Sequence, residues 1–420
     1  MFELIKKAAV DIKGVIEKTP LIYSSSFSKS FGFECYLKLE NLQKTGSFKA
    51  RGAYNKIKSL SEKERKAKGL YSSPPPIPPF LGGVWGGVRP GGVITASSGN
   101  HGQAVAWAAS LLNMRSTIVM PEGAPIIKQS AARGYGGHVI LHGNSFDEAY
   151  KYATELSQKK GMAFIPPFDD LLVIAGQGTA GLEIMEQLPD ADAVVVPIGG
   201  GGLISGIAQA VKGIKRDIMV IGVEAEAMPS CTVSLKAGKP VQVEKKPTLA
   251  DGIAVKKVGD ITLPIIKEYV DEVLMVKEET LAAAILNFLE RKKLVVEGAG
   301  AVSLAAAMEG KLSGRLKKVV FVVSGGNIDV TTLDRVIRLG LMKEGRIIRL
   351  STVLEDSPGS LASLTALIAS LKANILHILH ERDAPKALPG KTRVEAILEV
   401  QGPAHGRRVL KGLKDKGYEV

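Results

Sequence analysis

The sequence has few cysteines and no long hydrophobic run. Its 420 residues include only two cysteines, Cys35 and Cys231, so neither a disulfide framework nor a zinc site built on cysteine is expected. No run of about 18 apolar residues occurs that would span a membrane. The first ten residues include Glu3, Lys6 and Lys7 and therefore lack the apolar core of a signal peptide. These absences predict a soluble cytoplasmic protein that has no membrane partner.

Aromatic residues are also scarce, at 5% of the chain, although hydrophobic residues make up 45%. The core must therefore consist mainly of alanine, valine, isoleucine and leucine, which suits a parallel sheet covered by helices. The formal net charge is +13. However, no short tract is basic enough to bind nucleic acid, and no aromatic residues are interspersed for base stacking. We interpret the charge as solvated surface and expect no nucleic-acid partner.

Short apolar runs alternate with segments that carry apolar residues at helical spacing. This alternation predicts an α/β fold with mainly parallel sheets, in which ligands bind beyond the carboxyl ends of the strands. Two sheets are needed to use all of the strands. The larger domain, residues 1–340, should therefore be bilobed, with a small lobe at roughly 55–165 inserted in the large one. Strands are predicted at 93–96, 116–120, 138–141, 193–198, 218–224 and 318–323, with helices at 102–112 and 203–212.

The pattern changes after Gly340. Its order, βαββα, is one strand short of a ferredoxin-like βαββαβ module, and the linker at 341–346 is the expected boundary of a second domain at 346–420. The sequence ends at Val420, where a sixth element should begin, so the module is expected to be truncated or completed by a partner. Its strands are predicted at 347–354, 374–382 and 393–400, and its helices at 360–371 and 404–416.

One stretch, residues 71–92, fits neither pattern. Five prolines between positions 74 and 79 are followed by repeated glycine pairs around Trp85. Proline removes backbone donors and glycine raises the entropic cost of ordering, so neither a helix nor a sheet ladder is expected. Two explanations stay open: an inserted surface loop, and an unselected or misread stretch of coding sequence. No function is assigned to it.

The motif Ser47-Phe48-Lys49-Ala50-Arg51 places a lysine between apolar residues just before a helix. Desolvation lowers the pKa of an amine, and a neutral amine is what Schiff-base chemistry requires. The alternative is a lysine whose amine extends into solvent, as that of most lysines near apolar residues does.

The motif Ser97-Ser98-Gly99-Asn100-His101 lies between a strand and a helix. Its backbone N–H groups and small hydroxyls can bind a carboxylate at the helix N-terminus. The same residue types also favour an ordinary turn, so both interpretations stay open. His101 is expected to be structural rather than a catalytic base.

Four consecutive glycines, Gly199, Gly200, Gly201 and Gly202, precede Leu203 between another strand and helix. Such a run exposes N–H groups without obstruction by side chains, and the helix dipole favours an anion. It predicts a site for a phosphate group. It is neither a P-loop, because no Gly-Lys-Ser/Thr follows, nor a dinucleotide motif, because the spacing differs.

A fourth motif, Ser324-Gly325-Gly326-Asn327, follows the apolar run 319–323. A serine at the carboxyl end of a strand can contact a ring nitrogen of a ligand. Taken alone, the motif is only a turn.

The four motifs, in this order, resemble the fold-type II pyridoxal-phosphate family, and most closely its threonine ammonia-lyase and serine racemase branch. By this resemblance the chain is expected to convert L-threonine, and also L-serine, to a 2-oxo acid and ammonia. A homo-oligomer is expected on the same ground alone. The resemblance extends from Ile16 to Gly340 and includes Lys44-Thr45-Gly46-Ser47-Phe48-Lys49, Ala175-Gly176-Gln177-Gly178-Thr179, Leu249-Ala250-Asp251-Gly252 and Glu297-Gly298-Ala299-Gly300-Ala301.

The resemblance also implies a role for each motif residue. Lys49 is expected to carry pyridoxal 5'-phosphate and to take the Cα proton, and Ser98 matches a position that serine racemases use for reprotonation. Because Ser324 is not a carboxylate, loss of the β-hydroxyl should compete well with transamination. The cofactor is expected to contact Phe48 and Ser324 with its ring, Asn100 with its ring hydroxyl and 199–203 with its phosphate; the substrate carboxylate is expected to contact Ser97, Asn100 and His101.

Two further features bear on metals and regulation. Glu224 matches an acidic metal ligand of serine racemases, but Ser230 stands where they have aspartate, so no metal is predicted. The second domain resembles an ACT domain, a regulatory amino-acid-binding unit, and an amino-acid effector is expected there. A plain capped loop is the alternative explanation of its motif. The residues that carry this resemblance are Asp356-Ser357-Pro358-Gly359-Ser360-Leu361 and Asn374-Ile375.

Two rival functions stay open. Serine racemase with serine dehydratase activity is the nearest, and an amino-acid sensor with an inactive catalytic lobe belongs to a different class. The intact Lys49, glycine run and Ser324 argue against the sensor. Cysteine synthase is disfavoured because its members carry Thr-Gly-Asn where this chain has Ser98-Gly99-Asn100. Isoleucine biosynthesis and threonine catabolism are both compatible with the sequence.

Overall fold

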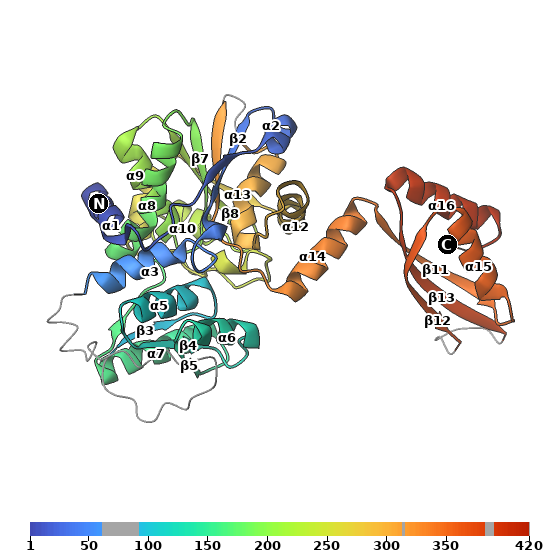
Figure 1. Cartoon of the computed structure of the whole chain (residues 1–420), viewed down its shortest axis with the longest axis horizontal. Helices are drawn as coiled ribbons and strands as arrows, with labels where there is room; N and C mark the ends of the chain where they lie inside the picture. The colour runs from blue at the N-terminus through green and yellow to red at the C-terminus, as the bar shows by residue number, and fades with distance from the viewer. Residues whose placement is uncertain (61–91, 313–315, 383–389, 420) are drawn as a thin grey trace. The chain divides into compact units, whose positions relative to one another are not determined.

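A computed structural model describes residues 1–60, 92–312, 316–382 and 390–419 (Figure 1). The described chain divides into two compact units, Met1–Ile328 and Asp329–Val420. Helix α14 (Val330–Lys343) belongs to the second unit, whereas the predicted domain boundary lies at its end; the predicted domain ranges stay predictions. Apart from Gly92, the proline- and glycine-rich stretch at 71–92 lies outside the described residues.

The larger sheet of the first unit has six strands in the order β1-β2-β10-β7-β8-β9. All neighbouring strands are parallel except β1, which is antiparallel to β2. Its central strands are almost continuous runs of buried apolar residues, as a sheet covered on both faces requires. The strands are β1 (Leu21–Tyr23), β2 (Glu34–Leu39), β7 (Ala193–Pro197), β8 (Met219–Ala225), β9 (Glu272–Val276) and β10 (Lys318–Val323).

Helices cover both faces of this sheet. Apolar residues of α8 and α9 form one core with alternate residues of β7, β8 and β10, such as Val194, Val220 and Val322, and α13 packs on the other face. The helices are α1 (Phe2–Ile12), α2 (Ser25–Phe31), α3 (Lys49–Lys58), α8 (Leu171–Gln187), α9 (Gly202–Ile214), α10 (Ser230–Ala237), α11 (Thr262–Tyr269), α12 (Glu278–Asn287) and α13 (Gly298–Met308), with short turns η1 (Glu40–Leu42), η2 (Asp251–Ile253) and η3 (Phe288–Lys292).

The smaller sheet is fully parallel and has the order β5-β4-β3-β6. It lies within the predicted small lobe, and Figure 1 shows it in teal together with its helices. The prediction of an α/β fold with two mainly parallel sheets is confirmed. The elements are β3 (Val93–Ala96), α5 (Asn100–Leu111), β4 (Ser116–Met120), α6 (Ile126–Gly134), β5 (His138–Leu141), α7 (Phe146–Lys160) and β6 (Ala163–Phe164).

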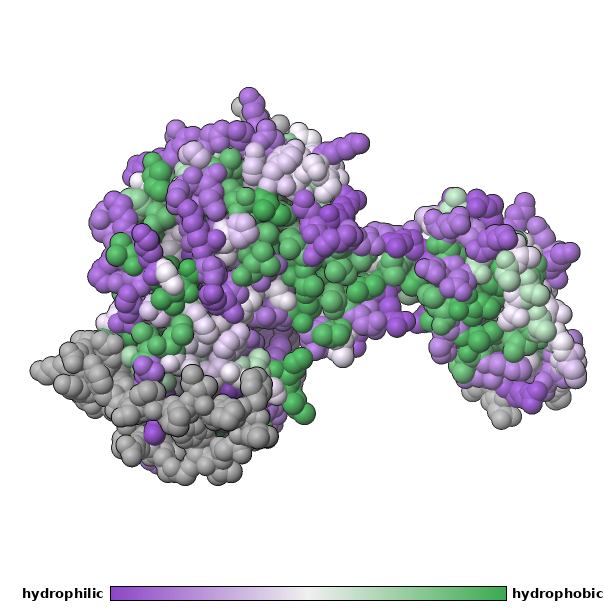
Figure 2. Space-filling view, in the orientation of Figure 1, coloured by the Kyte–Doolittle hydropathy of each residue, from purple (hydrophilic) through white to green (hydrophobic). Residues whose placement is uncertain are grey.

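The second unit contains an antiparallel sheet, β11-β13-β12, with two helices that share one core with it. This arrangement is consistent with the predicted ACT-type domain, and the described residues supply five of its six predicted elements. On the face visible in Figure 2, hydrophilic side chains cover much of both units. Within the described chain, no helix is both long and apolar enough to cross a membrane. The elements are β11 (Ile347–Glu355), α15 (Ser360–Ser370), β12 (Asn374–Glu381), β13 (Lys391–Glu399) and α16 (Pro403–Asp415).

A buried ion cluster joins β2, η1, α3 and α8. The Arg51 guanidinium bonds to the Glu40 carboxylate, with Nε–Oε2 at 2.8 Å, and to the Glu183 carboxylate, with Nη1–Oε1 at 2.6 Å. Lys38 Nζ donates to Glu183 Oε2 at 2.6 Å. Burial raises the pKa of Glu40, but the charge and hydrogen bonds of Arg51 outweigh burial and hold that pKa below its usual range. The cluster therefore fixes the helix that begins at Lys49.

Replacing Arg51 by methionine should lower the free energy of unfolding of the first unit by about 3–5 kcal/mol, because the buried Glu40 carboxylate would lose its ion-pair partner and keep only the hydrogen bond from the Thr19 hydroxyl. Urea unfolding followed by circular dichroism measures this change. Lys257→Met removes an ion pair that is largely exposed, with 46% and 72% of its two side chains accessible, and serves as the control, with a loss below about 1 kcal/mol. Equal losses in both variants would contradict the prediction.

Candidate active site

Lys49 is the first residue of α3, and Phe48 lies at its N-cap. The Lys49 Nζ donates a hydrogen bond to the Pro167 carbonyl at 2.7 Å and lies 5.0 Å from the centre of the Phe48 ring. Burial lowers the pKa of the Lys49 amine to about 8, against the opposing effect of the nearby Glu297 carboxylate. Near neutral pH, a useful fraction of this amine is therefore unprotonated and able to act as a nucleophile or base.

The Lys49 loop pairs with the Ser324 loop. Ser47 and Gly325 form an antiparallel bridge, and the Phe48 N–H donates to the Ser324 carbonyl at 3.1 Å. The Ser324 hydroxyl lies at the carboxyl end of β10, is buried, and is 3.2 Å from the Ala299 carbonyl that accepts its proton. Two of the four predicted motifs are thus brought together by backbone hydrogen bonds.

The Ser97-Ser98-Gly99-Asn100-His101 motif forms the turn between β3 and α5, and α5 begins at Asn100. The Ser97 hydroxyl accepts the Gly99 N–H at 3.2 Å, and Ser98 is partly exposed in the same turn. The first N–H groups of α5 follow directly, so the turn provides donors for an anion.

The His101 ring is buried and neutral. Its Nε2 lies 2.9 Å from the Ile165 carbonyl, which can only accept, so Nε2 carries the proton and Nδ1 is an acceptor. Burial, followed by the charge of Lys49, lowers the pKa of His101 to about 3. In this arrangement the ring has no proton left to donate to a substrate carboxylate. That predicted role of His101 stays a prediction and would require the ring to give up the Ile165 bond.

The glycine run lies between β7 and α9, with Gly201 in the left-handed region at φ 93°. A Cβ atom on Gly200 would come within 2.3 Å of the Phe168 ring, and one on Gly202 within 2.9 Å of the Phe168 Cβ. Over the described residues, none of the N–H groups of 199–203 donates to a backbone carbonyl. The loop therefore presents free donors at a helix N-terminus, as a phosphate group requires.

Short connections bring all four motifs to one place. Pro167 bonds to the Lys49 amine, and the adjacent Phe168 packs on the glycine run. Asn327 Nδ2 donates to Asn100 Oδ1 at 2.8 Å, which links the Ser324 motif to the start of α5. The amine, the free N–H groups, the Ser324 hydroxyl and the α5 turn thus form one site within the first unit.

Two residues of this site were given no role by the sequence. Glu297 accepts a hydrogen bond from Asn100 at 2.8 Å and is 5% exposed. Burial, and then the carboxylate of Asp251, raises the pKa of Glu297 to about 7. Asn327 is the second residue. The sequence gives only a weak sign of either residue: each is a polar side chain next to glycine or alanine residues. That pattern does not identify the group to which the side chain bonds.

Comparison with known proteins identifies the family. The profile of a family described as "Pyridoxal-phosphate dependent enzyme" matches residues 12–325. The chain belongs to this pyridoxal-phosphate dependent enzyme family.

Several members of the family are similar to this chain. The L-threonine ammonia-lyase of Thermotoga maritima is 50% identical over 418 residues, which cover 100% of this chain and 98% of the relative. A solved threonine deaminase from T.th. is 39% identical with a TM-score of 0.69, over 78% of this chain and 98% of that chain. Maize serine racemase is 34% identical with a TM-score of 0.71, over 81% and 98% of the two chains.

The residues of the site fit the cofactor of this pyridoxal-phosphate dependent family. The free N–H groups of 199–203 fit its phosphate, and a lysine amine with a pKa of about 8 fits its aldehyde. Two buried polar atoms, His101 Nδ1 and Ser47 Oγ, have no partner within the described chain and leave polar contacts for a bound ligand. The Glu224 carboxylate accepts the backbone N–H groups of Cys231 and Thr232.

The rate at which pyridoxal phosphate becomes covalently bound to the apoprotein should rise with pH up to about 8 and then level off. Only the neutral form of the Lys49 amine attacks the aldehyde, and that form predominates above its pKa, which is about 8. Borohydride trapping at a series of pH values measures this rate. Lys49→Arg, which keeps the charge, should give no adduct. A rate that still rises steeply near pH 10, about where an exposed lysine titrates, would contradict the prediction.

Proposed function

We propose that this chain is a threonine ammonia-lyase that converts L-threonine to 2-oxobutanoate and ammonia, with L-serine as a second substrate. The observation that carries the proposal is a single site that contains a lysine amine with a lowered pKa, a run of free N–H groups at a helix N-terminus and a buried serine hydroxyl. Full-length similarity to the L-threonine ammonia-lyase of Thermotoga maritima supports it.

Five groups would hold the cofactor. The N–H groups of 199–203 would bind its phosphate, Lys49 would bind its aldehyde carbon, and Phe48, Asn100 and Ser324 would contact its ring. When bound, pyridoxal phosphate supplies an electron sink for negative charge at the substrate Cα. The fixed positions of these groups, after β7 and β10 and at the starts of α3 and α5, keep the reacting atoms in one orientation.

Lys49 would then act as the base. Once the substrate amine has taken its place, the Lys49 Nζ is free to accept the Cα proton, and its pKa of about 8 suits proton transfer near neutral pH. The Pro167 carbonyl, 2.7 Å from Nζ, gives the released amine a fixed partner. The Ser324 hydroxyl is neutral, and if it donated its one proton to the ring nitrogen in place of the Ala299 carbonyl, it would not hold a positive charge there. This arrangement favours departure of the β-hydroxyl over transamination.

The substrate carboxylate would bind at the turn before α5. The Ser97 hydroxyl and the backbone N–H groups that open α5, that of Asn100 included, are the available donors, and the helix dipole favours a negative charge there. The neutral His101 ring would contribute an acceptor rather than a donor. Ser98, in the same turn, is the group that racemisation would need as a second proton donor or acceptor, so serine racemase is the alternative activity.

Purified protein should form 2-oxobutanoate from L-threonine and pyruvate from L-serine, and Lys49→Ala should reduce both rates by about a thousandfold or more because the base and the covalent anchor are lost together. Coupled assays of the 2-oxo acids measure the rates. Lys44→Ala, an exposed lysine in the same loop, is the matched control and should keep the parent rate. Formation of D-serine without a 2-oxo acid would favour the racemase, and a protein without cofactor absorbance would favour an amino-acid sensor.

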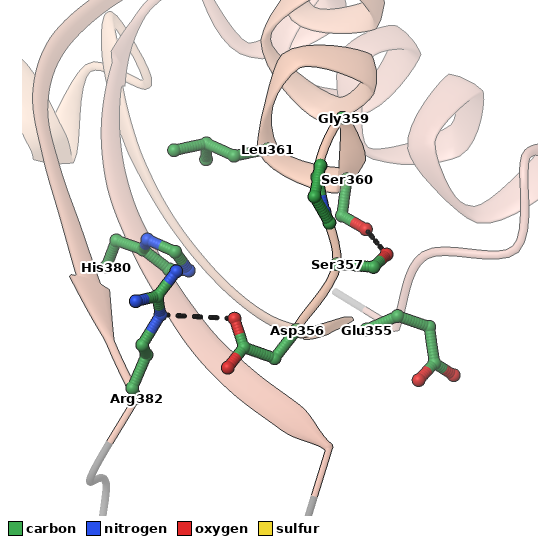
Figure 3. A pocket seen from close by; sticks show the side chains of 9 residues that line it. Glu355, Asp356, Ser357, Gly359, Ser360, Leu361, His380 and Arg382 are labelled. Atoms are coloured by element: carbon green, nitrogen blue, oxygen red, sulfur yellow. Dashed lines mark hydrogen bonds and ion pairs between the residues drawn. The ribbon is translucent and has the colours of Figure 1, made fainter.

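We also propose an amino-acid effector site in the second unit, at a pocket beside the start of α15 (Figure 3). Asp356 accepts a hydrogen bond from Arg382 at 3.1 Å, and the hydroxyls of Ser357 and Ser360 lie 2.9 Å apart. A carboxylate would suit the N-terminus of α15 and Arg382, and Asp356 would suit an ammonium group. The pairing of opposite charges thus matches the two ends of a free amino acid.

Isothermal calorimetry of the full chain should show saturable heat with isoleucine or valine, and Asp356→Asn should weaken binding about tenfold because the partner of the ammonium group loses its charge. Serine and threonine are titrated in parallel, since they also bind the catalytic site. Asp334→Asn, at an exposed ion pair of α14, is the control. Absence of saturable heat with isoleucine and valine, whatever serine and threonine show, would contradict the proposal. The homo-oligomeric state and the cytoplasmic location stay predictions.

A further inference from the structure

A chain of hydrogen bonds crosses the site from the Lys49 loop to α13. Asn327 Nδ2 donates to the Thr45 carbonyl and to Asn100 Oδ1, each at 2.8 Å. Asn100 Nδ2 then donates to Glu297 Oε1 at 2.8 Å. Its four groups come from the loop before α3, the end of β10, the start of α5 and the residue before α13.

This series of hydrogen bonds determines which way each amide group faces. The oxygen and nitrogen of an asparagine exchange places on a half-turn, so their assignment depends on the bonding partners. The Thr45 carbonyl can only accept, so Asn327 must turn its nitrogen toward it. The second proton of that nitrogen then meets Asn100, which must present its oxygen. Consequently the Asn100 nitrogen faces Glu297 and keeps one proton for another acceptor.

Glu297 can accept the hydrogen bond from Asn100 at any pH near neutrality. Burial, and then the charge of Asp251, raises the pKa of Glu297 to about 7, so both of its ionisation states are populated. A carboxylate accepts at either oxygen, and a carboxylic acid keeps a carbonyl oxygen that accepts. The Asn100 nitrogen therefore has an acceptor in either state.

Two glycines leave the space that this series of hydrogen bonds occupies. Gly46 has φ 71°, and a Cβ atom there would lie 2.3 Å from Asn327 Oδ1. A Cβ atom on Gly325 would lie 2.3 Å from Glu297 Oε1. The positions of the Asn327 and Glu297 side chains thus each require a neighbouring residue that has no side chain.

We propose that Asn327 and Glu297 are positioning residues that hold the Asn100 amide in one orientation, with its remaining N–H available to donate to the ring hydroxyl of pyridoxal phosphate. The inference rests on the cofactor contact proposed for Asn100. A donated hydrogen bond favours the ionised form of the ring hydroxyl. With the amide reversed, its oxygen would face the ring oxygen and favour the protonated form instead.

The test uses Asn327→Asp, whose carboxylate keeps the shape of the side chain but has no proton to donate to Thr45 or Asn100. Two readouts are independent of turnover: the Kd of the apoprotein for pyridoxal phosphate, and the pH midpoint at which the absorbance of the bound cofactor changes. We expect Kd to rise about tenfold, which corresponds to about 1.4 kcal/mol, and the midpoint to rise by about one unit. Asn287→Asp, at a partly buried asparagine on α12, is the matched control and should change neither.

Glu297 is tested by a conservative pair. Glu297→Gln keeps an acceptor for the Asn100 nitrogen and should leave Kd within about threefold of the parent, whereas Glu297→Leu removes the acceptor and should resemble Asn327→Asp. Equal effects of the two substitutions would mean that Glu297 acts through its charge or volume, and would overturn its proposed role.

A double-mutant cycle separates positioning from a general structural effect. In an Asn100→Ala background, Asn327→Asp should have no further effect on either readout, and additive effects would overturn the proposal. If Asn327→Asp lowers the melting temperature of the apoprotein enough to prevent titration, Asn327→Ala removes the donors without adding charge and replaces it. Parent-like Kd and midpoint in the Asn327 variant would also overturn the proposal. Failure of the parent to bind the cofactor through Lys49 would instead overturn the proposed function.

Discussion

The antiparallel bridge between Ser47 and Gly325 is the contact on which the site depends. It ties the loop that carries Lys49 to the carboxyl end of β10, so the backbones at Lys49 and Ser324 are held close together. Backbone pairing is suited to this purpose because its geometry does not vary with side-chain rotamers. The buried guanidinium of Arg51, two residues beyond Lys49, then holds the first turn of α3 against η1 and α8. Lys49 is thereby positioned from both sides.

The low pKa of Lys49 follows from the same arrangement. Burial of the amine lowers it, while the Glu297 carboxylate opposes that effect. Each partner is buried, and each has a pKa closer to neutrality than an exposed residue of its type. A base with a pKa of about 8 can accept a proton near neutral pH, which is the role proposed for Lys49.

Much of the fold could be predicted from the sequence because buried parallel strands are short, continuous apolar runs. The predicted runs at 93–96, 116–120 and 318–323 coincide with β3, β4 and β10. Strand β2 was not predicted, because it contains Lys38, a charged residue that is fully buried. Its charge is compensated by Glu183, which lies 145 residues away. Local pattern carries no information about such a partner. The same reason explains why the motifs of the site were recognised but the roles of Glu297 and Asn327 were not.

Sequence separation across the site has a consequence for the order in which the protein acquires its function. Arg51 and Glu183 are 132 residues apart, and Thr45 and Asn327 are 282 apart. Contacts over such distances form late, because the loop between them must close first. A nascent chain that has not yet reached Asn327 contains Lys49 and the glycine run but not the loop that pairs with them. We therefore expect the cofactor to bind only when nearly the whole first unit has left the ribosome. Until then, Lys49 of an unfinished chain would not react with the cofactor aldehyde.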